Sequence, residues 1–92
     1  MELLTAEEIA RELGKLPGWT LSGKEIRTTV EHRDFTEAMG FVVSVALLAE
    51  KANHHPDIDI RWNRVGLALS THSAGGLTAK DFALASRIAA LR

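Results

Sequence analysis

The sequence contains no cysteine, and its 92 residues carry a net charge of only −1. The lack of cysteine excludes disulfides and thiolate chemistry, so a zinc site would need histidines and carboxylates alone. The small net charge argues against a protein that binds nucleic acid by neutralising its phosphates. No apolar run approaches the roughly 20 residues that cross a bilayer, and the N-terminal MELLTAEEIA is too polar for a signal peptide. We therefore expect a cytoplasmic protein without a direct nucleic-acid or membrane partner.

The chain contains enough hydrophobic residues to form one core. Hydrophobic residues make up 46% of the sequence and charged residues 25%, which is the composition of a soluble globular protein. No low-complexity segment or linker interrupts the chain, and 92 residues suit one compact unit. We therefore predict a single domain over residues 1–92.

Capping signals mark the starts of three predicted helices. A Thr or Asp followed three residues later by an acidic residue is typical of a helix N-terminus. The segments that follow such a signal are IARELGKL after Thr5, FTEAMGFVVSVALLAEKAN after Asp34, and AKDFALASRIAALR after Thr78. Alternating apolar residues predict a hairpin before the second helix and another before the third. The order α-ββα-ββα favours an α+β fold of two layers, a four-stranded antiparallel sheet with helices packed on one face.

The second hairpin, DIDIRW and VGLALSTH, is expected to turn at Asn63-Arg64. Pairing of Trp62 with Val65 would then place the large apolar residues of both strands on one face. The opposite face would carry small residues beside His72, at the end of the second strand. That arrangement leaves room near His72 for a flat ligand.

The central helix, residues 35–53, is apolar on two sides. One stripe contains Ala38, Phe41, Val42, Val45, Leu48 and Ala49, and the other contains Met39, Val43, Ala46 and Leu47. A helix apolar on two sides usually buries both, one on its own sheet and the other on a partner. We expect a homodimer or homotetramer through this helix. The alternative is that another helix of the same chain covers the second stripe.

Histidines and acids provide the candidate chemistry. His54 and His55 lie where Pro56 ends the central helix, so their rings can point in different directions. A histidine can give or take a proton near neutral pH, so histidines around one cavity suit acid-base catalysis. His72, before a Gly-rich loop, is the third candidate.

Structural explanations compete with this interpretation. A histidine at a helix C-terminus can simply stabilise the helix dipole, and Asp81 in the first turn of a helix can do the same. Adjacent histidines lack the i,i+4 spacing that is usual for metal ligands, so we expect no metal site. His32, within the charged stretch VEHRD, is expected at the surface.

The spacing of these residues resembles the signature of the pterin-4a-carbinolamine dehydratase family. The similarity runs over nearly the whole chain and is strongest from residue 35 to 92. The matching positions are Glu50, His54-His55-Pro56, Trp62, His72 and Asp81. The resemblance implies a lyase that dehydrates 4a-hydroxytetrahydropterin (pterin-4a-carbinolamine) to quinonoid dihydropterin and water, without metal or organic cofactor. It implies a role in tetrahydrobiopterin recycling.

The resemblance also implies roles for individual residues. His54 and His72 would form the acid-base pair, and His55 would hold the pterin ring. Substrate-orienting or substrate-binding positions would be Glu50, Asp81, Trp62 and Ser73, with Trp62 in the core or the pocket wall. Some relatives act instead as dimerisation or assembly cofactors, which leaves protein binding through the apolar central helix as an alternative. Because a scaffold need not keep three histidines, the sequence favours the enzyme.

Overall fold

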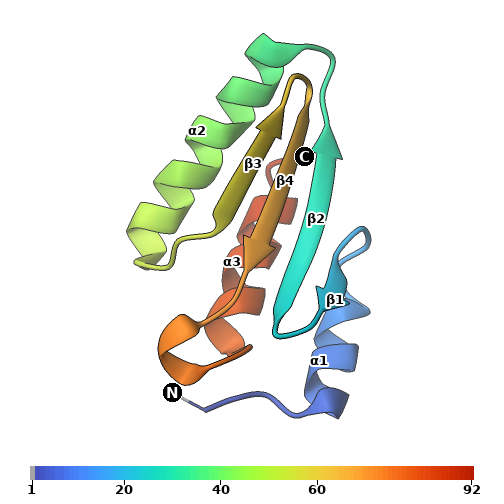
Figure 1. Cartoon of the computed structure of the whole chain (residues 1–92), viewed down its shortest axis with the longest axis vertical. Coiled ribbons are helices and arrows are strands. Elements are labelled where there is room, and N and C mark those ends of the chain that lie inside the picture. Colours follow the sequence, from blue (N-terminus) through green and yellow to red (C-terminus); the bar gives the residue numbers. More distant parts are fainter. Residues whose placement is uncertain (1) are drawn as a thin grey trace.

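In the part of the chain that the structure describes, three helices and four strands follow one another in the predicted order (Figure 1). The structure is a computed structural model that describes residues 2–92; residue 1 of the predicted domain lies outside them. The elements are α1 (Ala6–Leu13), β1 (Thr20–Ser22), β2 (Glu25–Glu31), α2 (Phe35–Ala52), β3 (Asp57–Arg61), β4 (Arg64–Leu69), the 3-10 turn η1 (His72–Ala74) and α3 (Ala79–Ala89). The predicted α+β class is confirmed.

The predicted helix starts are made by side chains that accept hydrogen bonds from free backbone N–H groups. At α1, the Thr5 hydroxyl accepts from the N–H of Glu8 at 3.1 Å, and the Glu8 carboxylate accepts from the N–H of Thr5 at 2.9 Å. At α2, Asp34 accepts from the N–H of Glu37, while the Glu37 carboxylate reaches the N–H of Arg33 instead. These backbone donors hold the pKa values of Glu8, Asp34 and Glu37 below their ordinary values.

The sheet is antiparallel throughout and has the strand order β1-β2-β4-β3. Alternate side chains of the two central strands point into one core, with Val30 paired to Val65 and Ile26 to Leu69. Buried side chains of α2 and α3, such as Val45 and Leu84, join the same core. Both helices therefore pack on that face of the sheet, as predicted, and His54 and His55 follow the end of α2.

The second hairpin turns one residue earlier than predicted. Arg61 pairs with Arg64, so the turn residues are Trp62 and Asn63. The expected pairing of Trp62 with Val65 is wrong, and Trp62 is 67% exposed with a positive φ of 52°. Asn63 explains the position of the turn, because its side-chain amide donates to the His32 carbonyl at 2.8 Å and its own carbonyl accepts from the His32 N–H at 2.7 Å.

The second apolar stripe of α2 stays largely uncovered. Leu47 is 68% exposed and Val43 is also exposed, so no other segment within residues 2–92 covers them. The alternative of a covering helix from the same chain therefore fails for these two residues. None of the helices in the described part of the chain is long and apolar enough to cross a membrane.

Candidate functional site

His54 binds a carboxylate that is completely buried. Asn53 ends α2 in the left-handed conformation, with φ 50° and ψ 45°, and this turns the chain toward the start of α3. The His54 Nε2 then lies 2.6 Å from Oδ1 of Asp81. The His54 side chain is 11% exposed and that of Asp81 is 0% exposed. The end of one helix and the beginning of another therefore fix the relative position of the two groups.

The second oxygen of Asp81 is held by two threonines that were not predicted as site residues. Its Oδ2 accepts from the Thr71 hydroxyl at 2.8 Å and from the backbone N–H of Thr78 at 2.9 Å. The two hydroxyls lie 2.8 Å from each other, and both residues are buried. The spacing of Thr78 and Asp81 signalled the helix start, but nothing local to Thr71 indicated its contact with Asp81.

His55 binds a different carboxylate. Its Nε2 lies 2.5 Å from Oε1 of Glu50, on the last turns of α2, and both side chains are exposed. The two adjacent histidines thus pair with different acids, one buried and one in solvent. Glu50 and Asp81, which the sequence grouped with the histidines, are their direct partners.

His72 lies just beyond β4, in the turn η1, and not on the strand itself as predicted. Thr71 closes this turn, because its carbonyl accepts from the N–H groups of Ala74 and Gly75 and its own N–H donates to Gly76. His72 and Ser73 are both exposed. His72 lines a hollow of about 330 Å³ together with Ser22, Lys24, Glu25, Ser70 and Gly75.

His54 lines a separate hollow of about 230 Å³. The charged residues around it are Lys51, Lys80 and Arg87. The two histidines that the sequence assigned to one cavity, His54 and His72, therefore border two separate hollows. Trp62, at the tip of the second hairpin, lines neither hollow, so the structure gives no support to its predicted place in a core or pocket wall.

Within residues 2–92, no three His, Cys, Asp or Glu side chains converge in a way that could hold a metal ion. The acceptors of Asp81 are already occupied by hydrogen-bond donors.

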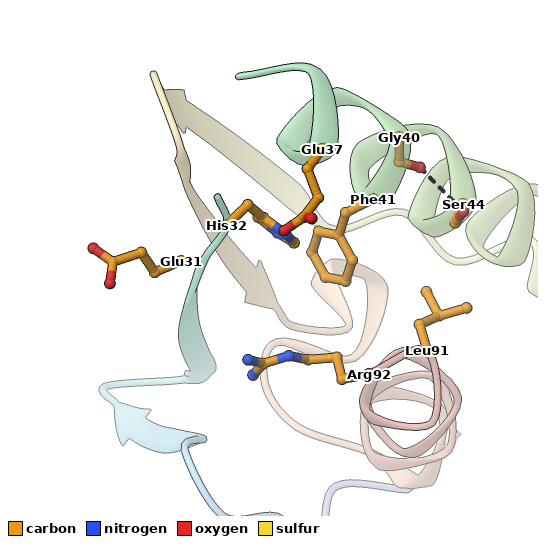
Figure 2. Close-up of a pocket in the computed structure, with 8 residues that line it drawn as sticks. All are labelled: Glu31, His32, Glu37, Gly40, Phe41, Ser44, Leu91 and Arg92. Carbon is orange, nitrogen blue, oxygen red and sulfur yellow. Dashed lines mark hydrogen bonds and ion pairs between the residues drawn. The ribbon is translucent and has the colours of Figure 1, made fainter. Parts of the chain in front are cut away.

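A larger hollow, of about 490 Å³, contains none of the predicted site residues (Figure 2). It lies between the first half of α2, the end of β2 and the segment after α3, and it contains His32. The expectation that His32 lies at the surface is wrong: its side chain is 9% exposed, and its ring centroid is 4.8 Å from that of Phe41. Its Nδ1 lies 3.4 Å from the Glu37 carboxylate.

Comparisons with known proteins agree with the resemblance found in the sequence. A family model described as pterin 4 alpha carbinolamine dehydratase matches residues 2–91. A relative from Roseiflexus castenholzii, provisionally named pterin-4-alpha-carbinolamine dehydratase, is 60% identical over 86 residues, which cover 94% of this chain and 92% of the relative. A relative from Acidobacterium capsulatum with the same provisional name is 57% identical over 91 residues, 99% of each chain.

Two solved structures share the fold. A protein from Brucella melitensis, described as a transcriptional coactivator/pterin dehydratase, has a TM-score of 0.93 and 37% identity over 98% of both chains. A pterin dehydratase-like protein identified as a RuBisCO assembly factor in the alpha-carboxysome has a TM-score of 0.69 over 80% of this chain and 88% of that one. At 23% identity, this second likeness shows the fold alone. On the family match and the close relatives, the chain belongs to the pterin 4 alpha carbinolamine dehydratase family.

Proposed function

We propose that the protein is a lyase that dehydrates 4a-hydroxytetrahydropterin to quinonoid dihydropterin. The observation that carries the proposal is the His54–Asp81 pair, buried beside the turn that presents His72, in a chain that matches the family over residues 2–91. A histidine held by a buried carboxylate is suited to proton transfer in a fixed direction.

The chemistry requires two proton transfers and no redox partner. A base removes the proton from N5 of the pterin, the C4a–O bond breaks, and an acid protonates the departing hydroxyl, which leaves as water. The electron pair of the N5–H bond forms the C4a=N5 double bond. His54 and His72 are the proposed acid-base pair, each contributing on the order of 10²–10⁴-fold. The family resemblance implies that the reaction uses neither a metal nor an organic cofactor.

The exposed residues of the site are proposed to hold the substrate. The His55 ring, bound to Glu50 at 2.5 Å, presents a flat surface for the pterin. Ser73 follows His72 in an exposed turn and offers a hydroxyl to the pterin edge. In the cytoplasm, such an enzyme would recycle the pterin that aromatic amino acid hydroxylases release.

Self-association through α2 is part of the same proposal. Val43 and Leu47 form an exposed apolar face on α2, and burial of such a face against a second copy would stabilise a dimer or tetramer. The same face makes protein binding a second candidate function, since an apolar helix face can also bind a foreign helix.

The test is the rate at which enzymatically generated 4a-hydroxytetrahydropterin loses water, followed by ultraviolet absorbance. The wild type is expected to accelerate the reaction, and His54→Ala and His72→Ala are expected to lose at least about 100-fold each. Ser86→Ala, on the exposed side of α3, is the control and should behave as wild type. A folded wild type without activity would reject the proposal and favour the protein-binding function.

A further inference from the structure

The hydroxyl groups of Thr78 and Thr71 form a chain of hydrogen bonds that ends at the Asp81 carboxylate. The Thr71 hydroxyl has a single proton, which it donates to Oδ2 of Asp81. In the 2.8 Å contact between the two threonines, the Thr78 hydroxyl must therefore be the donor. The Thr78 oxygen in turn accepts from the backbone N–H of Lys80 at 3.3 Å. Every group in this chain directs a proton toward the Asp81 carboxylate.

These donors suit an ionised Asp81 carboxylate. Its Oδ2 receives two donors, the Thr71 hydroxyl and the Thr78 N–H. An ionised carboxylate is a pure acceptor and suits all of these contacts. The remaining oxygen, Oδ1, then needs a donor in its 2.6 Å contact with His54.

The donor must be Nε2 of His54, and this fixes the tautomer of the neutral ring. With the proton on Nε2, the other nitrogen, Nδ1, carries a free electron pair. Among the described residues, His32 Nε2 is the only buried side-chain nitrogen or oxygen without a partner. Nδ1 of His54 has no hydrogen bond to residues 2–92 either, so it is open to solvent.

We propose that Thr71 is a positioning residue that selects Nδ1 of His54 as the base in the dehydration. Through Asp81 it holds the proton on Nε2, so that Nδ1 takes the N5 proton of the pterin. The imidazolium that forms then lies against the Asp81 carboxylate, which stabilises its charge. The backbone of the same threonine closes the turn that carries His72, so one residue sets the geometry of both members of the acid-base pair. This inference rests on the proposed function for its catalytic part, but not for the tautomer.

The experiment compares Thr71→Val, which removes the hydroxyl at nearly constant volume, with Thr71→Ser, which keeps it. Long-range ¹H–¹⁵N correlation spectra in mildly alkaline buffer, where an unperturbed histidine is neutral, report which ring nitrogen of His54 is protonated. Dehydration kinetics are measured in parallel. Thr28→Val is the matched control, because Thr28 is also buried and its hydroxyl donates to the Gly18 carbonyl at 2.8 Å, far in sequence from His54 and His72.

We expect the wild type to show protonated Nε2 and bare Nδ1. In Thr71→Val the His54 signals should move toward a mixture of tautomers, and kcat should fall about 10- to 100-fold with little change in KM, as for partners that orient metal-bound histidines. Thr71→Ser should restore both readouts, and Thr28→Val should lose stability without changing either.

Three results decide the matter. Protonated Nδ1 in the wild type overturns the assignment, and this measurement does not depend on any variant folding. Wild-type spectra and wild-type kcat in folded Thr71→Val overturn the role of Thr71. The expected spectra in a protein that does not dehydrate the pterin support the tautomer and reject the proposed function instead.

Discussion

At the scale of single residues, two adjacent histidines occupy opposite environments. The His54 ring is almost enclosed and contacts a buried carboxylate, whereas the His55 ring lies in solvent beside Glu50. A buried hydrogen bond fixes a ring more firmly than an exposed one, which water and salt can weaken. This contrast supports the proposed roles of His54 in proton transfer and of His55 in holding the substrate.

Glu50→Gln should weaken pterin binding with little effect on the stability of the fold. Because the pair is exposed, the change is expected to alter the free energy of unfolding by less than about 1 kcal/mol. The His55 ring loses an ionic partner, so KM for the pterin should rise while kcat changes little. Urea denaturation and steady-state kinetics measure the two effects, with Glu7→Gln on α1 as the control. An unchanged KM would show that Glu50 does not orient His55 for substrate binding.

The sequence was enough to pick out candidate residues, but not the contacts between them. His54, His72 and Asp81 were chosen as candidates because a histidine or a helix-capping acid can be recognised by itself. Thr71 was overlooked, since a threonine at the end of a strand has no local sign of a contact with a distant acid. His32 was wrongly expected at the surface because its neighbours are charged, and the Phe41 ring that covers it comes from another element.

At the scale of elements, the helix starts follow from local chemistry. Each predicted N-terminus is present because a side chain three residues or fewer away satisfies free N–H groups. The turn of the second hairpin was predicted one residue late. A tryptophan with positive φ is rare, and the contacts of Asn63 with His32 that place the turn join segments about thirty residues apart.

The acidic side chains that cap the helix starts should make the protein less stable at low pH. The pKa values of Glu8, Asp34 and Glu37 lie below the ordinary 4.5 for Glu and 3.8 for Asp. The folded state therefore binds fewer protons than the unfolded state, so this contribution is complete above the ordinary values and is lost as the pH falls through the lowered ones.

Asp34→Asn tests this linkage at α2. Asparagine caps a helix about as well as aspartate but takes up no proton in acid. The fall in urea midpoint between about pH 6 and about pH 3 should be smaller in the variant than in the wild type. Asp59→Asn, an exposed acid of β3, is the control and should keep the full fall. Equal falls in Asp34→Asn and wild type would show that this cap does not contribute to acid sensitivity.

At the scale of the whole molecule, the order of elements was enough to predict the architecture. Two hairpins and three helices in that order leave an antiparallel sheet covered on one face as the simplest way to bury the apolar residues. The sequence could not show that His54 and His72 border different hollows, because that depends on how α3 packs beside the end of α2.

Leu47→Glu should abolish self-association. Leu47 is 68% exposed, so a glutamate is accommodated in the single chain but would place a charge within the proposed interface. Sedimentation velocity should show a dimer or tetramer for wild type and for Ser86→Glu, and a monomer for Leu47→Glu. A wild type that sediments as a monomer at micromolar concentration would reject assembly through α2.

The first turn of α3 has a dynamic consequence. Thr78 begins this helix, and its backbone N–H and hydroxyl also belong to the contacts around Asp81. Thr78 and Asp81 are completely buried, so this helix start should open only together with the packing around it. Opening of this turn would release the Asp81 carboxylate that holds the His54 ring. Heat or denaturant that opens the start of α3 should abolish the proposed dehydratase activity, and slow amide exchange at Thr78 should accompany that activity.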